Sequence, residues 1–177
     1  MSWQEEVLDF WFSLRPEQWW SADPALDEAI RDRFIELWER QRQCPPERLL
    51  GSPREALAAV ILFDQFPRNM FRGHADQFST DPLALAVAKG AVERGYDDAL
   101  TPQQRGFLYM PFQHSENIED QKRSLGLYTA LGNAEQLHYA KLHHDVIARF
   151  GRFPHRNAIL GRTPRPEEVE AGEVVPW

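Results

Sequence analysis

Apolar residues recur along the chain with the spacing of α-helices, and proline, glycine and capping residues separate the segments. The first segment, residues 3–14, places five apolar side chains on one helical face: Trp3, Val7, Phe10, Trp11 and Leu14. After Asp23-Pro24, an N-cap with proline at the first helical position, a second stripe begins, formed by Leu26, Ile30, Phe34, Leu37 and Trp38. No segment alternates with period two, so we expect no sheet.

The next segment predicts a central, buried helix over residues 53–66. Ser52 and Glu55 form a capping box at its start. The stretch Ala56 to Phe63 is apolar on every side, which is typical of a helix packed on all faces. Pro67 disfavours helical geometry in the residue before it, so we expect the helix to end at Phe66.

The second part of the chain repeats these start and stop signals. Helices are predicted from Asp81-Pro82 to just before Gly95, from Thr101-Pro102 to Pro111, over 118–131, over 134–150 and over 163–170. Short loops favour antiparallel hairpins stacked as a bundle or short superhelix, so the prediction is an all-α fold in one domain, 1–177. The similar stretches 63–69 and 150–157 suggest two pseudo-equivalent halves, about 1–95 and 96–177.

Composition narrows the class of protein. A net charge of −7 argues against nucleic acid as a partner. The longest apolar run is too short to span a bilayer, and the acidic N-terminal stretch is unlike a signal peptide, so we expect a cytoplasmic protein without membrane contact. Cys44 is the one cysteine, which excludes disulfides and thiolate metal centres within the chain and leaves a bystander or catalytic thiol.

Two ionisable residues fall inside apolar helical faces. Asp64 continues the stripe formed by Leu57, Val60 and Ile61, and His143 falls within the apolar arc of its own helix. A buried charge is costly unless it is paired, which makes both residues candidates for acid–base chemistry or ligand binding. Asp64 has an alternative structural role as a hydrogen-bond acceptor at a helix corner, with Arg68 or Arg156 as its partner. The alternative for His143 is that it is a core residue whose hydrogen bonds are satisfied.

His114 and Glu116 lie on a predicted turn between helices, where polar side chains are free to face a ligand. A His-x-Glu pair supplies only two metal ligands, so we predict no metal. Glu116 has the alternative role of complementing the dipole of the following helix. Phosphate loops, dinucleotide glycine patterns and nucleophile elbows are absent from the sequence, and we predict no cofactor.

Two similar corners carry an arginine followed by an asparagine. They are Arg68-Asn69 and the stretch His155, Arg156 and Asn157. Arginine offers a planar fork for a carboxylate or phosphate, and arginines gather in the last third of the chain, which suggests an anionic ligand. The alternative is that these groups fix the backbone and neutralise acidic helices.

Several stretches together resemble a known bacterial family. They are Val-Leu-Asp-Phe-Trp-Phe at 7–12, Asp-Gln-Phe-Pro-Arg-Asn at 64–69, Phe-Arg-Gly at 71–73, Thr-Asp-Pro at 80–82, Leu-Tyr-Met-Pro-Phe-Gln-His-Ser-Glu at 108–116 and the segment 149–162. The chain looks like the family named domain of unknown function 924, which implies a tetratricopeptide-like α–α superhelix and no known activity. His144 and Gln113 depart from the residues usual in that family, arginine and glutamate, which weakens any mechanism that needs charge there.

These patterns support three hypotheses. The leading one is a binding module for a peptide or a small anionic ligand. The alternative is a hydrolase-type enzyme in which Asp64, His114, Glu116 and His143 converge on one pocket. The third is an assembly role, with a homodimer formed through the aromatic N-terminal helix.

Overall fold

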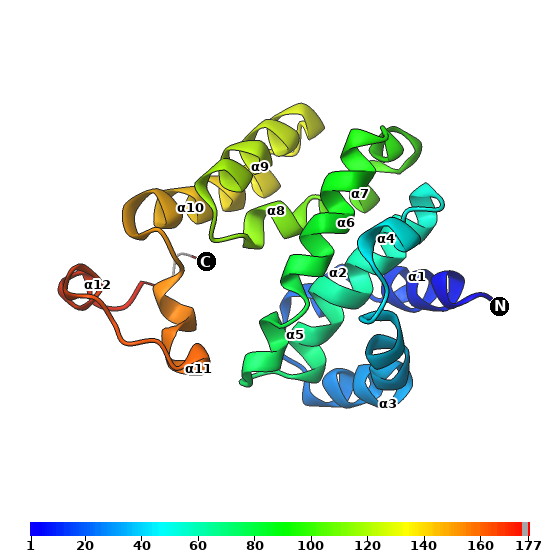
Figure 1. The fold of residues 1–177 in the computed structure, drawn as a ribbon, viewed down its shortest axis with the longest axis horizontal. Coiled ribbons are helices and arrows are strands. Elements are labelled where there is room, and N and C mark those ends of the chain that lie inside the picture. Colours follow the sequence, from blue (N-terminus) through cyan, green and yellow to red (C-terminus); the bar gives the residue numbers. More distant parts are fainter. Residues whose placement is uncertain (175–176) are drawn as a thin grey trace. The chain divides into compact units, whose positions relative to one another are not determined.

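The computed structural model describes residues 1–174 and 177, and it consists of helices joined by short turns (Figure 1). No strand occurs in these residues, which confirms the predicted all-α class. The chain forms two compact units, Met1–Leu108 and Tyr109–Trp177, called unit 1 and unit 2 below. The tetratricopeptide-like arrangement and the equivalence of two halves stay predictions.

Unit 1 contains seven α-helices among several shorter 3-10 turns. They are α1 (Trp3–Ser13), α2 (Pro16–Trp20), α3 (Pro24–Gln41), α4 (Pro53–Val60), α5 (Phe66–Met70), α6 (Asp81–Glu93) and α7 (Pro102–Leu108). The predicted caps form: Asp23 accepts the first amides of α3, and Ser52 accepts the Glu55 amide of α4. Glu55, however, bonds to the amide of Gly51 instead of Ser52. The backbone of Gly95 is left-handed after α6, as glycine allows.

The described residues of unit 2, 109–174 and 177, form five α-helices. They are α8 (Met110–His114), α9 (Ile118–Leu131), α10 (Ala134–Phe150), α11 (Asn157–Leu160) and α12 (Pro166–Ala171). Two residues connect α9 to α10: Gly132 with φ of 79° and Asn133, whose side chain accepts the Gln136 amide. Such a short connection lets the two helices pack side by side as an antiparallel hairpin (Figure 1).

The central helix does not end at Phe66, so that predicted boundary is wrong. One π-helical turn, Ile61–Gln65, follows α4, and the chain continues into α5 with Pro67 inside it. Pro67 has no N–H for the carbonyl of Phe63 four residues earlier. The hydroxyl of Thr80 donates to that carbonyl instead, at 2.7 Å, and itself accepts the indole N–H of Trp38 at 3.1 Å.

Two other helix boundaries differ from the predicted ones. Pro111 does not stop the preceding helix, because α7 already ends at Leu108 and Pro111 lies in the first turn of α8, where a missing N–H costs nothing. The terminal helix begins at Pro166, whereas we predicted residue 163. The short helix α2 was not predicted.

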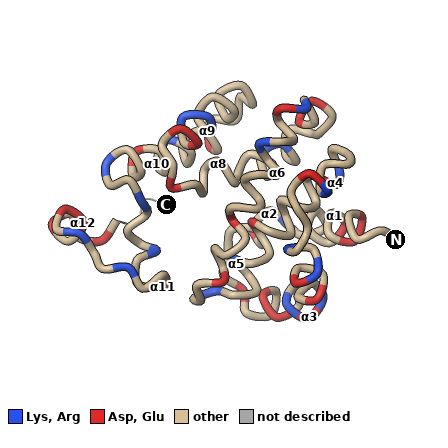
Figure 2. The backbone as a smooth tube through the Cα atoms, in the orientation of Figure 1, with Lys and Arg blue, Asp and Glu red and all other residues tan. Residues whose placement is uncertain are grey.

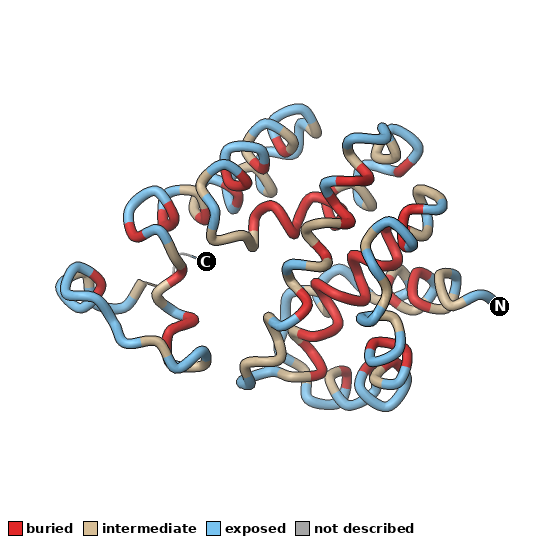
Figure 3. Tube along the Cα trace, viewed as in Figure 1, coloured by how far each residue is buried: buried red, intermediate tan, exposed pale blue. Residues whose placement is uncertain are grey.

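Each unit has its own buried interior. Figure 3 shows the π-helical turn and most of α4 as buried, and every residue from Ala56 to Gln65 is buried. In unit 2 the core is formed by Val146, Ile147, Phe150 and Phe153. Within the described residues, every helix is too short or too polar to cross a membrane.

Candidate functional site

Asp64 lies in the π-helical turn of unit 1 and is fully buried. Its carboxylate is 3.7 Å from Nη1 of Arg68, and Nε2 of Gln65 donates to it at 2.7 Å. A π turn redirects side chains that a regular helix would place elsewhere, and such turns are frequent at functional sites. The predicted inward placement of Asp64 is therefore confirmed, with Arg68 near it.

The first Arg-Asn corner is held by carboxylates of unit 1. Arg68 donates to both oxygens of Asp81, at 2.7 and 2.9 Å, and also to the backbone carbonyl of Asp64. Burial opposes its charge, but Asp81 and Asp64 outweigh that cost and raise the pKa of Arg68. Asn69 donates to Asp27, which also pairs with Arg72.

His143 is buried in unit 2 on α10. Its Nδ1 is 2.7 Å from the carbonyl of Tyr139, and because a carbonyl only accepts, Nδ1 carries the proton. The pKa of His143 is lowered to about 3, first by burial and then by the positive charges of His114, Arg156 and His155. The hydrogen bond to the Tyr139 carbonyl acts in the opposite direction and raises this pKa. The imidazole is thus uncharged at neutral pH.

Aromatic rings surround His143. The indole of Trp177 stacks on the imidazole with ring centres 3.5 Å apart and planes 12° apart. Phe153 and His155 meet the same indole edge-on, with ring centres at 5.7 and 5.2 Å. We call His143, Phe153 and His155 the ring slot. The ring of His114 lies 6.1 Å from that of His143.

Glu116 takes part in an ion-pair cluster of unit 2. Both of its oxygens accept from Nη1 of Arg162, at 3.0 and 2.8 Å, and Nη1 of Arg156 lies 3.8 Å away. Arg156 also donates to the backbone carbonyl of His114 and lies over the ring of Phe153. The second Arg-Asn corner thus fixes the turn that carries His114 and Glu116.

Glu168 is a buried residue that the sequence analysis missed. Arg152 donates to both carboxylate oxygens of Glu168, at 2.6 and 2.8 Å. The amide of Arg165 and the side chain of Asn157 also donate to this carboxylate. These hydrogen bonds, that of Arg152 first, lower the pKa of Glu168 to about 2. Its predictive signal was its place at the third position of a proline-opened helix, where a carboxylate caps the backbone.

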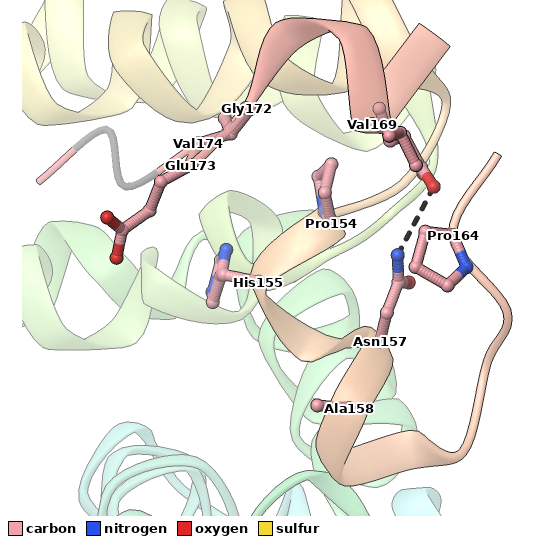
Figure 4. Close-up of a pocket in the computed structure, with 10 residues that line it drawn as sticks. Pro154, His155, Asn157, Ala158, Pro164, Val169, Gly172, Glu173 and Val174 are labelled. Carbon is pink, nitrogen blue, oxygen red and sulfur yellow. Dashed lines mark hydrogen bonds between the residues drawn. The ribbon is translucent and has the colours of Figure 1, made fainter. Parts of the chain in front are cut away.

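A pocket of about 470 Å³ opens between α12 and the turn that leads into α11 (Figure 4). Its lining is mainly apolar and includes Pro154, Ala158, Pro164, Val169 and Val174. His155 also lines it, and therefore belongs to both the pocket and the ring slot. In Figure 2 the glutamates of α12 lie close to the arginines of the preceding loop.

The predicted site residues are thus divided between the units. His114, Glu116, His143, His155, Arg156 and Asn157 lie together in unit 2, whereas Asp64, Arg68 and Asn69 lie in unit 1. Convergence of all four candidate catalytic residues on one pocket stays a prediction. Across residues 1–174 and 177, no group of three or more His, Cys, Asp or Glu side chains is arranged to hold a metal ion.

Comparisons with known proteins identify the family. Residues 7–171 match the model of a family described as bacterial proteins of unknown function, DUF924. A solved structure of a protein of unknown function from Agrobacterium tumefaciens is similar, with 40% sequence identity, a TM-score of 0.90 and 96% of each chain covered. No protein in the curated set matches. The chain belongs to the bacterial family of unknown function DUF924.

Proposed function

We propose that the protein is a binding module, and that the ring slot of unit 2 receives a flat aromatic side chain of a peptide. The observation that supports this proposal is the position of Trp177. One face of its indole is covered by a buried imidazole and two edges are met by rings, yet 41% of the residue remains exposed. Trp177 thus occupies the slot as a ligand would.

The chemistry of the slot suits a neutral aromatic ring. Aromatic pairs contribute about 0.5–1.5 kcal/mol each beyond the area they bury. His143 is uncharged at neutral pH, so its face stacks on an indole without the desolvation of a cation. Its Nδ1 proton is used by Tyr139, which leaves Nε2 as a hydrogen-bond acceptor.

A small anionic ligand has less support than a peptide side chain. The arginines expected to hold an anion already face carboxylates of this chain: Arg68 holds Asp81, Arg152 holds Glu168, and Arg156 lies 3.8 Å from Glu116. At Arg68 and Arg152 a ligand anion would have to displace a bidentate partner from the same chain, which costs strong charge-assisted hydrogen bonds.

A hydrolase function also has less support. A general base works best with a pKa near the working pH, and the pKa of His143 is lowered to about 3. Glu116, the nearby carboxylate, is bound through both oxygens to Arg162. These two groups are arranged to fix structure around the slot and not to exchange protons with a substrate at neutral pH.

The proposal is tested with N-acetyltryptophanamide as the probe, titrated into the full chain by calorimetry. Trp177→Ala empties the slot and should bind the probe, whereas the wild type should bind it about tenfold more weakly, because its own indole competes. Trp20→Ala removes an exposed tryptophan of unit 1 and is the matched control, with binding as in the wild type.

The double variant Trp177→Ala/His143→Ala lacks the imidazole on which the probe would stack, so it should not bind the probe. Circular dichroism confirms that each variant is folded. If a folded Trp177→Ala protein fails to bind the probe at millimolar concentration, the ring slot is not a binding site and the proposed function is wrong.

A further inference from the structure

The segment that ends in Trp177 carries two anchors to the surface of unit 2. Val174 packs against the core formed by Val146, Ile147, Phe150 and Phe153. Three positions later, Trp177 fills the ring slot. We call Val174 and Trp177 the tail anchors. An extended chain spans at most about 10 Å in three residues, which is a distance that a short peptide can bridge without secondary structure.

The pocket beside the slot is formed partly by the segment that carries the tail anchors, because Gly172, Glu173 and Val174 line it. Val174 is one wall of the 470 Å³ space, with Pro154 and Val169 among the others. His155 lines this pocket, and its ring also meets the indole of Trp177 with ring centres 5.2 Å apart. The core surface that Val174 covers adjoins the ring slot, because Phe153 belongs to both.

Gly172 marks the point from which the tail anchors depart. Its backbone has φ of 73° and ψ of −148°, a region that only glycine adopts readily. A Cβ at this position would meet no neighbouring atom within 4 Å, so glycine is required here by the backbone direction and not by crowding. The direction taken at Gly172 brings Val174 to the core.

We propose that unit 2 recognises a peptide segment of a partner protein in which an aliphatic residue precedes a tryptophan by three positions, and that Val174 and Trp177 hold this site until such a segment replaces them. This inference rests on the proposed function and adds to it the sequence pattern of the partner. The tail anchors supply the pattern: they pair an aliphatic with an aromatic side chain at a fixed spacing on adjoining subsites.

The tail anchors also act as an internal competitor. A segment tethered a few residues from its site has an effective concentration in the millimolar range, so a free peptide must compete with it for the slot. The apparent affinity of the wild type for a peptide is lowered by the fraction of molecules with the site occupied. Removing the indole of Trp177 should therefore tighten peptide binding about tenfold when about 90% of molecules hold it in place.

The experiment uses three peptides, acetylated and amidated, and the Val174→Ala/Trp177→Ala protein, in which both tail anchors are removed. Val-Ala-Ala-Trp carries the proposed pattern, Ala-Ala-Ala-Trp lacks the aliphatic anchor, and Val-Ala-Trp shortens the spacing by one residue. Dissociation constants come from calorimetry, and amide chemical shifts of unit 2 locate the site. We expect Val-Ala-Ala-Trp to bind at least about fivefold more tightly than either control, the contribution of one buried aliphatic side chain.

Each other outcome overturns part of the proposal. Equal binding of all three peptides would leave the ring slot in place and refute the aliphatic subsite. Failure of all three to bind, while N-acetyltryptophanamide binds, would refute the peptide as ligand. Failure of the peptides and of N-acetyltryptophanamide together would refute the proposed function as well.

A second copy of this chain carries the same pattern and is the remaining occupant to test. Sedimentation of the wild type over a range of concentrations should show no dimer that depends on Trp177. A dimer that forms at micromolar concentration and is lost in Trp177→Ala would show that the tail anchors exchange between copies, and the partner-protein proposal would be wrong.

Discussion

Protonation of His143 should oppose the folding of unit 2, and His143→Phe should remove that dependence on pH. Phenylalanine keeps a flat ring under Trp177 and keeps the core filled, but it never carries charge. The lost hydrogen bond to the carbonyl of Tyr139 is a constant cost at every pH, since that bond exists whether or not Nε2 is protonated. The pH-dependent part of the difference therefore belongs to the imidazole charge.

The sign and size of this change in stability follow from the pKa of His143. It falls from an ordinary 6.5 to about 3 in the folded protein, so between these pH values only the unfolded chain binds the proton. The stability of unit 2 should therefore decrease as pH falls from 6.5 toward 3. At about 1.4 kcal/mol per pH unit, the ceiling of this loss is about 5 kcal/mol, and partial hydration of the site lowers it.

Hydrogen exchange of the α10 amides measures this effect, because it reports the opening of unit 2 without requiring unit 1 to unfold. Protection free energies of wild type and His143→Phe are compared at pH 7, 6, 5 and 4. We expect a nearly constant difference above pH 6.5 and a growing advantage of the variant below it. Parallel curves down to pH 4 would refute the assignment of a neutral, desolvated imidazole at this position.

Three further predictions concern other residues. Glu168→Gln should lower the thermal midpoint of unit 2 and remove acid sensitivity between pH 4.5 and 2, where a depressed carboxyl pKa loses its stabilisation, as followed by circular dichroism. Thr80→Val should cost about 1–3 kcal/mol in urea unfolding, since two buried partners lose their hydrogen bonds. Gly172→Ala should strain the backbone by roughly 1–3 kcal/mol and tighten binding of N-acetyltryptophanamide in calorimetry, whereas Gly126→Ala, also in open space, should not.

Local sequence signals predicted most of the helices because their causes lie within a few residues. Asp23 and Asn133 cap the amides that follow them, and Gly132 supplies the left-handed residue between α9 and α10. Such interactions depend little on the rest of the fold. Their positions were therefore predictable without knowledge of any tertiary contact.

The π-helical turn was not predictable in this way. Proline at 67 is a stop signal when only the chain before it is considered, because one backbone bond is lost. In the structure the lost bond is replaced by Thr80, a residue 17 positions from Phe63, which is held in place by Trp38. A tertiary contact thus overrides the local rule, and the same turn places Asp64 in the buried interior.

The candidate site could be predicted only in part, because the partners of its residues lie far away in the sequence. Asp64 and His143 were correctly predicted to face inward and Glu168 was missed, and the partners of such residues determine which of them are available to a ligand. Glu116 and Arg162 are bound to each other, 46 positions apart, and no helical spacing relates them. Trp177 carries no periodic signal at all, although it makes the stack on His143. Because these charged groups satisfy one another, we propose that unit 2 recognises rings and aliphatic side chains, and that a peptide with both is a better candidate ligand than an anion.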